Sequence, residues 1–75
     1  MKIDINYSKI IENIEKLRVK KNMSVSDLSI KTGIKRKRII HILNGTQFIK
    51  LVELVYICNQ LEINMKDILE YKVTY

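Results

Sequence analysis

The sequence predicts an all-α fold, a compact bundle of five short helices. Residues that break helices are scarce, since the 75 residues include no proline and only two glycines, Gly33 and Gly45. Apolar side chains recur every three or four positions, which is the spacing that buries one face of a helix. A chain of this length has room for one domain with a modest core. We therefore expect a single domain over residues 1–75, with its helical core at residues 8–70.

The first helix is expected over residues 9–21, with Ser8 as its N-cap. Its inner stripe would consist of Ile10, Ile14 and Leu17. The polar run Lys20-Lys21-Asn22 ends this helix.

The second and third helices are separated by a short turn. Ser24 followed by Asp27 indicates a capping box, in which the two side chains satisfy backbone N–H groups at a helix N-terminus. Gly33 ends the second helix, because glycine adopts a positive φ without strain. The third helix is expected over residues 36–43, and Asn44-Gly45 ends it. The side chains expected to face inward are Leu28, Thr32, Ile34, Ile39 and Ile42.

The fourth helix is expected over residues 50–61, and a short fifth helix, capped by Asn64, over residues 65–70. The inner face of the fourth helix would contain Leu51, Leu54, Val55, Cys58 and Leu61, and the fifth helix would add Ile68 and Leu69.

The two ends of the chain follow a different pattern. In residues 1–7 and 71–75, apolar and polar side chains alternate, as they do in strands. These segments are either short strands, paired with each other or with a second subunit, or frayed ends. The sequence slightly favours frayed ends.

Basic residues are concentrated in one part of the chain. The net charge is +6, and nine basic residues but only one acid, Asp27, lie between Lys16 and Arg38. This asymmetry indicates either a basic face for a polyanionic partner or a solvated surface that keeps the protein in solution. The charge alone favours neither reading.

The sequence shows no pattern of catalytic or metal-binding residues. Cys58, the only cysteine, has apolar neighbours and is expected to be buried. His41 has no nucleophile or orienting acid near it in sequence, so it is discounted as a catalytic base. We therefore expect no enzymatic activity, no metal and no small-molecule cofactor. With no signal peptide and no apolar run of membrane-spanning length, we expect a cytoplasmic protein without membrane association.

The segment from Val25 to Ile42 is typical of two helices joined by a tight turn. Spaced motifs extend this pattern along the chain: Ile14-x-x-Leu17-Arg18, Met23-Ser24-x-x-x-Leu28, Gly33-Ile34, Ile39, Asn44-Gly45, Leu51-x-x-Leu54-x-x-Ile57 and Leu61-x-Ile63. In these motifs, residues 10–69 resemble the Cro/CI-type (Xre-like) helix-turn-helix domain of phage and bacterial repressors. The resemblance implies a lambda-repressor-like fold and double-stranded DNA as the partner.

The resemblance further implies that the helix of residues 36–43 enters the major groove. Positions 36, 37, 40 and 41 of this helix share the side opposite Ile39 and Ile42. Arginine can bind guanine O6 and N7 with two hydrogen bonds, and an isoleucine can pack on a thymine methyl group. Ile40 has a second reading, a contact with the core or with a partner subunit. The residues expected to read bases are Arg36, Lys37, Ile40, His41 and, from the following loop, Gln47.

Phosphate contacts are implied for Ser24, Lys35, Arg38, Asn44, Thr46 and Lys50. Arg18 joins this set because the glutamate that usually precedes Asn-Gly in the family, its usual partner, is Leu43 here. Residues 35–38 place four cations at a helix N-terminus, where the helix dipole disfavours positive charge and a nearby phosphate would reverse the cost. The alternative is a solvated run of charge.

The sequence also departs from the family pattern at Val25, which replaces a common glutamine, and at Ile49, which replaces a proline. Lys35 stands where a capping serine or threonine is usual, so the third helix should begin without a side-chain cap.

These observations predict a sequence-specific DNA-binding regulator of transcription, a repressor of phage, plasmid or bacterial origin. It would act as a homodimer on a near-palindromic site, with a dimer surface that includes the fifth helix and the tyrosine-rich tail. The alternative is a protein-interaction module on the same fold, such as an antitoxin or an anti-repressor. Its anchors would be Ile40, Tyr56, Tyr71 and Tyr75.

Overall fold

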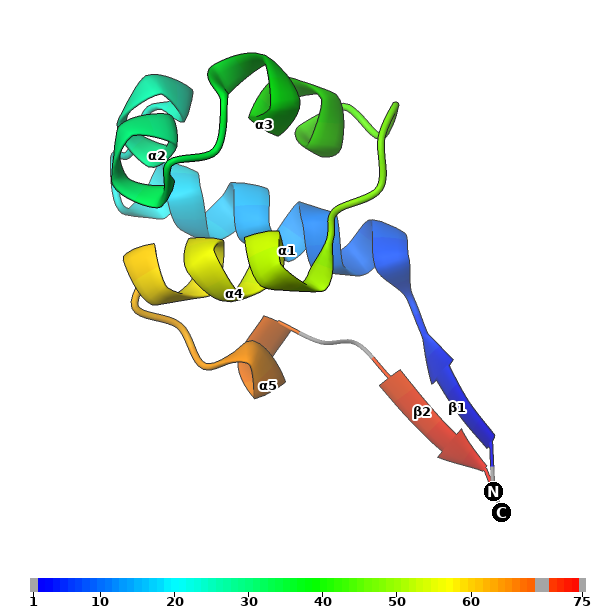
Figure 1. Cartoon of the computed structure of the whole chain (residues 1–75). Helices are drawn as coiled ribbons and strands as arrows, with labels where there is room; N and C mark the ends of the chain where they lie inside the picture. The colour runs from blue at the N-terminus through cyan, green and yellow to red at the C-terminus, as the bar shows by residue number, and fades with distance from the viewer. Residues whose placement is uncertain (1, 69–70, 75) are drawn as a thin grey trace.

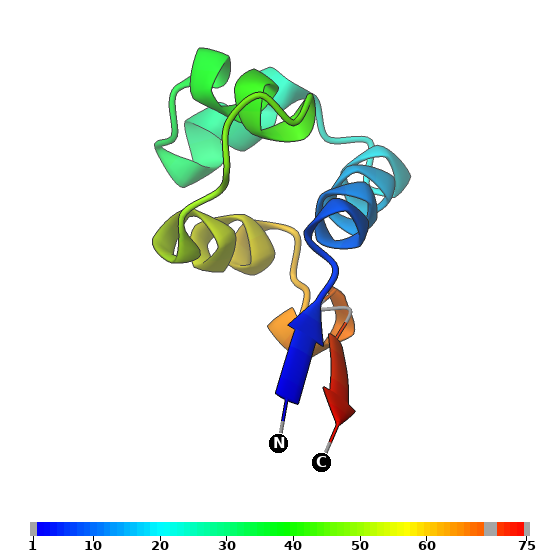
Figure 2. The same ribbon diagram turned by 90° about the vertical axis from the view of Figure 1, so that its right-hand side faces the viewer.

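Helices make up most of the computed structural model, which describes residues 2–68 and 71–74 (Figure 1). The elements in chain order are β1 (Lys2–Ile5), α1 (Tyr7–Lys20), α2 (Val25–Thr32), α3 (Arg36–Leu43), α4 (Leu51–Gln60), α5 (Met65–Ile68) and β2 (Tyr71–Thr74). In both views α2 and α3 form one layer, α1 and α4 lie beneath it, and α5 lies below α4 (Figures 1 and 2). The prediction of a bundle of five short helices is confirmed.

An aliphatic core lies between the two layers of helices. Its buried members are Ile10, Ile11, Ile14, Leu28, Ile34, Ile39, Ile42, Leu54, Ile57, Cys58, Leu61 and Ile68. Burying one aliphatic side chain of this size stabilises a fold by about 1.5–3 kcal/mol. The core therefore takes residues from all five helices and from the turn between α2 and α3, and it fixes how the helices are oriented.

The N-terminus of α2 has the predicted capping box. Ser24 Oγ accepts the Asp27 N–H at 2.9 Å, and Asp27 Oδ2 accepts the Ser24 N–H at 3.1 Å. These hydrogen bonds from Ser24 hold the pKa of the Asp27 carboxyl below its ordinary value.

The turn between α2 and α3 is closed by side chains as well as by glycine. Gly33 has a φ of 76°, and its N–H donates to Ser29 O at 2.9 Å. The Ser29 hydroxyl donates to Ile34 O at 2.6 Å, and the Thr32 hydroxyl donates to Leu28 O at 2.7 Å. The turn is thus tied to the helix that precedes it, which sets the angle at which α3 begins.

The start of α1 differs from the prediction. The helix begins at Tyr7, and Asn6 rather than Ser8 caps it, with Asn6 Oδ1 accepting the Lys9 N–H at 3.1 Å. Asn6 has the extended backbone that an N-cap needs, whereas Ser8 is already helical.

The predicted inner face of α4 is partly wrong. Leu54, Cys58 and Leu61 are buried as expected, but Leu51 and Val55 are exposed, and Ile57 is the fourth buried residue. At about 100° per residue, Ile57 and Cys58 lie on either side of the direction of Leu54, whereas Val55 lies about 100° from it, beyond the buried side. The helix itself spans Leu51–Gln60, and Leu69, predicted to add to the core, lies outside the described residues.

Both end segments contain a strand, so the expectation of frayed ends is wrong. β1 and β2 pair antiparallel within one chain, with Lys2 opposite Thr74 and Ile5 opposite Tyr71. The pair extends away from the helices, on the side opposite the α2–α3 layer (Figures 1 and 2). Within the described residues, no helix is long and apolar enough to cross a lipid bilayer.

We predict that Gly33→Ala lowers the free energy of unfolding by about 1–2 kcal/mol, because an L-residue is strained at positive φ. No atom lies within 4 Å of the added Cβ, so the cost is conformational and not a clash. Urea denaturation measures it.

Glu62→Gly is the reverse control, since Glu62 is not a glycine but has a φ of 56°, in the left-handed region that favours glycine. This change should leave stability unchanged or raise it by less than about 1 kcal/mol. Equal destabilisation by both substitutions would contradict the role given to backbone conformation.

Candidate nucleic-acid interface

Helix α3 has one buried side and one exposed, basic side. Ile39 and Ile42 are buried in the core, each 1% exposed. On the other side Arg36 and Lys37 are exposed, and Ile40 is 36% exposed. His41, one turn after Lys37, is half-buried. The predicted division of the helix into an inner and an outer side is confirmed.

The first turn of α3 is held from α2. Lys35 makes no side-chain cap, as its residue type implies. Arg36 Nε donates to Ser26 Oγ on α2 at 3.2 Å. This contact fixes the direction of the Arg36 side chain and leaves both terminal Nη groups available.

The loop after α3 is folded back on His41. The backbone N–H groups of Thr46 and Gln47 donate to His41 O at 3.0 and 3.2 Å. The Thr46 hydroxyl lies 2.9 Å from His41 Nδ1 and 2.7 Å from Asn44 Oδ1. Asn44 Oδ1 also accepts the Thr46 N–H at 3.0 Å. Three of the predicted site residues, Asn44, Thr46 and His41, therefore form one connected group at the end of α3.

Arg38, expected to contact phosphate, is instead bound within the protein. Its Nε and Nη2 donate to the Glu53 carboxylate of α4 at 3.0 and 2.8 Å, which is a two-point ion pair. Nη2 also donates to Phe48 O at 2.8 Å, and Nη1 donates to Gln47 Oε1. Arg38 thus links α3, the loop and α4, and all three guanidinium nitrogens donate hydrogen bonds within the protein.

Glu53 has a second partner. Its Oε1 accepts the N–H of Lys50 at 2.9 Å, so the same carboxylate also satisfies the N-terminus of α4. The hydrogen bond from Arg38 holds the pKa of the Glu53 carboxyl below its ordinary value. Sequence reasoning missed Glu53. The available signal was an acid three residues after Lys50, which fits an N-terminal cap but does not reveal a partner on α3.

Arg18 also has partners within the chain. It lies on α1 one turn from Glu15, to which both its Nε and Nη2 donate, and its Nη1 donates to Met23 O at 2.6 Å. The phosphate contact expected for Arg18 rests on the loss of its usual partner in the family. In the structure Glu15, three residues before Arg18, provides a partner.

Ser24 and Lys50 lie at the starts of α2 and α4, and both are exposed. The Ser24 Oγ accepts the Asp27 N–H as the N-cap of α2. Its own O–H hydrogen can still be donated to a phosphate.

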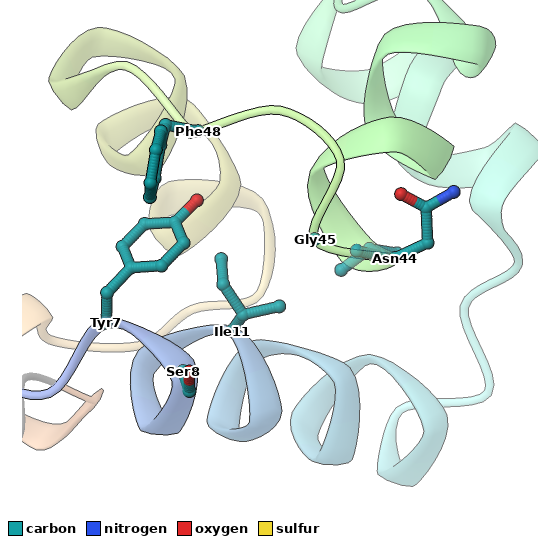
Figure 3. Close-up of a pocket in the computed structure, with 7 residues that line it drawn as sticks. Tyr7, Ser8, Ile11, Asn44, Gly45 and Phe48 are labelled. Carbon is teal, nitrogen blue, oxygen red and sulfur yellow. The ribbon is translucent and has the colours of Figure 1, made fainter.

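Tyr7 on α1 holds the far end of the loop. Its hydroxyl accepts the Ile49 N–H at 2.8 Å, and its ring meets that of Phe48 edge-on at 4.9 Å between centroids. Beside Tyr7 is a hollow of about 350 Å³, lined by Tyr7, Ser8, Ile11, Leu43, Asn44, Gly45 and Phe48 (Figure 3). The loop therefore bridges this hollow, anchored by Arg38 on one side and Tyr7 on the other.

Comparison with known proteins identifies the family to which this chain belongs. Residues 13–73 match the model of the Cro/C1-type HTH DNA-binding domain. The chain belongs to this family. It is also 41% identical over 64 residues to an uncharacterized HTH-type transcriptional regulator, YozG, of Bacillus subtilis (strain 168), covering 84% of this chain and 76% of that protein.

Among solved structures, the fold is similar to that of the restriction-modification controller protein C.AhdI from Aeromonas hydrophila. The TM-score is 0.76, with 21% identity, over 83% of this chain and 94% of the other. The α2–α3 pair lies within the residues that match the Cro/C1-type HTH domain. In the part of the chain that the structure describes, no three His, Cys, Asp or Glu side chains are grouped so as to hold a metal ion.

We predict that Glu53→Gln destabilises the protein at pH 7 and destabilises it less at pH 3. The folded pKa of Glu53 lies below its ordinary value of 4.5. The stability that the ionised carboxylate contributes is therefore complete above about pH 4.5 and is lost as the pH falls through the folded pKa. Thermal unfolding of the parent and the variant at both pH values measures the difference.

Glu62→Gln is the matched control, because it removes an exposed carboxylate from outside the Arg38–Glu53 pair. A Glu53→Gln deficit that stays constant between pH 7 and pH 3 would contradict the ion pair.

Proposed function

We propose that this protein binds specific sites in double-stranded DNA and regulates transcription, with α3 in the major groove. The observation that carries the proposal is the outer side of α3, where Arg36 and Lys37 are exposed and fixed on a helix whose other side is buried. Membership of a family of DNA-binding domains supports it. We assign the protein a cytoplasmic role as a repressor, without catalysis, metal or cofactor.

Arg36 and Lys37 are the proposed readers of the first bases. Ser26 occupies Arg36 Nε, so the two Nη groups remain to meet the O6 and N7 atoms of a guanine. Ile40 and His41 follow one turn later. Ile40 can pack on a thymine methyl group, and the His41 ring is steadied by Thr46.

Gln47 is a reader of restricted chemistry. Its carbonyl oxygen accepts from Arg38, while both amide N–H groups remain to donate to DNA. Glutamine can bind adenine N6 and N7 together. Because its oxygen is held toward Arg38, Gln47 is proposed chiefly as a donor, to guanine, to N7 of adenine or to a phosphate oxygen.

Phosphate contacts are proposed for Ser24, Lys35, Asn44, Thr46 and Lys50, which lie at helix ends or in the loop after α3. Arg38 and Arg18 are proposed instead to position these elements, since both guanidinium groups are bound within the protein.

Two copies are proposed to act together on a near-palindromic site. Their recognition helices would lie about 34 Å apart, one turn of the duplex. A second candidate, a protein-interaction module, is favoured by the exposure of Tyr56 and Ile40. Of its other proposed anchors, the Tyr71 side chain and Tyr75 lie outside the described residues. Partner binding that persists at high salt would distinguish it from DNA binding.

We predict that Arg36→Ala weakens binding to the preferred DNA site by about 1–3 kcal/mol and relaxes selection at one base position. Selection from a random DNA library identifies the site, and fluorescence anisotropy then measures the affinity of each variant.

Lys66→Ala is the control for charge, because Lys66 is exposed on α5, away from the α2–α3 layer (Figure 1). Should both alanine variants lose affinity equally and keep the same base preference, α3 would not be the reading element.

We predict that affinity falls linearly in a plot of log K against log salt concentration, because bound lysines displace counterions from DNA. Replacing Lys35 or Lys50 by alanine should reduce the slope by about one unit for each phosphate that the variant no longer neutralises. A slope near zero for the parent protein would contradict DNA as the partner.

A further inference from the structure

We propose that His41 reads an exocyclic amino group in the major groove, that of cytosine or of adenine, by accepting its hydrogen at Nε2. Thr46 and Asn44 are assigned as the positioning residues that fix the ring in the form this requires. The inference rests on the proposed placement of α3 in the major groove, and it names the base chemistry that one residue of α3 selects. The sequence gives His41 a place among the readers but not the direction of its hydrogen bond.

The orientation of the Asn44 side-chain amide follows from the backbone beside it. Asn44 Oδ1 accepts the Thr46 N–H at 3.0 Å. With the amide turned over, its NH₂ group would face that N–H, and two donors would meet. The oxygen of the Asn44 amide is therefore the atom that lies toward Thr46.

The Thr46 hydroxyl has three neighbours but a single hydrogen to donate. Its Oγ1 lies 2.7 Å from Asn44 Oδ1, 2.9 Å from His41 Nδ1 and 3.2 Å from the backbone oxygen of His41. The two oxygens can only accept, whereas a ring nitrogen of histidine can carry its own hydrogen. If the hydroxyl donated to Nδ1, Oγ1 and Oδ1 would lie 2.7 Å apart with no hydrogen between them. The hydroxyl therefore donates to Asn44, and Nδ1 donates to Oγ1.

This arrangement fixes which ring nitrogen of His41 is protonated. A neutral imidazole carries one hydrogen, so a hydrogen on Nδ1 leaves Nε2 with a free lone pair. Within residues 2–68 and 71–74, no group hydrogen-bonds to Nε2, and the ring is only half-buried. His41 therefore offers an acceptor on the outer side of α3.

An acceptor in the major groove selects bases by their donors. The donors there are the N4 amino group of cytosine and the N6 amino group of adenine, whereas guanine presents O6 and N7 and thymine presents O4. Two acceptors that face each other repel, so guanine and thymine are unsuited to Nε2. A phosphate oxygen is also an acceptor, which makes His41 a reader of bases and not of the DNA backbone.

His41 adds a polarity that the other polar readers do not supply. Arg36 and Lys37 carry only donors, and Gln47 is proposed chiefly as a donor because Arg38 holds its oxygen. These side chains suit the acceptors of guanine. An acceptor one turn after Lys37 adds a position at which guanine and thymine are rejected.

The same hydrogen bonds change what the loop contributes. Thr46 gives its hydroxyl hydrogen to Asn44, and its N–H points to both Asn44 Oδ1 and His41 O, so it has no donor left for a phosphate. The phosphate contact proposed for Thr46 then falls to Asn44 Nδ2. Figure 3 shows the Asn44 amide directed away from α1. Thr46 itself acts through His41.

The protonation of the ring can be measured on the protein without DNA, because His41 is the only histidine of the chain. Two-dimensional ¹H–¹⁵N NMR distinguishes a protonated ring nitrogen from an unprotonated one by its chemical shift. At about pH 8, where an ordinary histidine is neutral, we expect Nδ1 to be protonated and Nε2 to be unprotonated. A majority of the opposite form overturns the inference.

Three variants test the part played by Thr46. Thr46→Val removes the hydroxyl, keeps the shape of the side chain and should release the ring, so that both neutral forms are populated. Thr46→Ser retains a hydroxyl and should restore the parent spectrum. Ser8→Ala is the matched control, since it removes an exposed hydroxyl on α1 and should leave the spectrum unchanged. If Nδ1 stays as fully protonated in Thr46→Val as in the parent, the inference fails. Circular dichroism confirms that each variant is folded.

The base preference is measured on DNA at the same pH. Selection from a random library, with the parent and with His41→Ala, identifies the position that His41 reads as the one whose preference the variant loses. Among four duplexes that differ only there, the parent should bind those with cytosine or adenine more tightly than those with guanine or thymine. The difference should be about three- to tenfold, as expected for one hydrogen bond.

Thr46→Val should lose the discrimination at this position and keep the discrimination at the position read by Arg36. Thr46→Ser should keep both. A preference for guanine or thymine at the His41 position, or a site whose preferences His41→Ala leaves intact, overturns the inference.

This inference and the proposed function fail in different ways. A parent that selects DNA through Arg36 but has Nε2 protonated leaves the proposed function standing and overturns the reading by His41. A parent that binds no DNA overturns the proposed function, and the reading of an amino group is then wrong as well, whatever the NMR spectrum shows of the ring.

Discussion

The burial of Ile39 and Ile42 is the constraint on which the rest of the interface depends. Helix α3 has only eight residues, begins with three cations and has no side-chain cap. A helix so short is not stable alone in water, and its dipole disfavours positive charge at its start. It persists because its two isoleucines enter the core. That same burial obliges Arg36 and Lys37 to face outward.

The two arginines of α3 show how position on a helix decides what a charge does. Arg36 and Arg38 are two residues apart, so they point to different sides of the helix. Arg36 donates from Nε to the Ser26 hydroxyl, and both of its Nη groups remain to meet a ligand. Arg38 meets a carboxylate on α4 and two groups of the loop, and it becomes part of the scaffold. A run of four basic residues is therefore not a run of four equivalent contacts.

Local signals predicted the helix-turn-helix itself. The capping box at Ser24 and the left-handed Gly33 each depend on residues within one turn of the chain, so they can be recognised without a tertiary structure. The contacts that could not be predicted join residues that lie far apart in the sequence. Arg38 and Glu53 are separated by 15 positions, and Tyr7 and Ile49 by 42. Either pairing requires the relative placement of α1, α3 and α4, which periodicity does not provide.

The same limit explains the error on α4. Apolar residues at positions 51, 52, 54, 55, 56, 57 and 58 leave the helix apolar on nearly every side, so periodicity cannot select the inner face. The structure selects the side of Leu54, Ile57 and Cys58, and the remaining residues are left outside. The apolar residues that misled the prediction therefore lie exposed on the outer side of this helix.

Glu53 lies between these two surfaces of α4. It follows Val52 on the outer face and precedes Leu54 in the core, while its carboxylate holds Arg38 and, through Arg38, the Gln47 amide. Loss of this carboxylate would release Arg38 and, with it, the contact that holds Gln47. The proposed reading of DNA by Gln47 therefore depends on a carboxylate that lies on another helix, outside the loop itself.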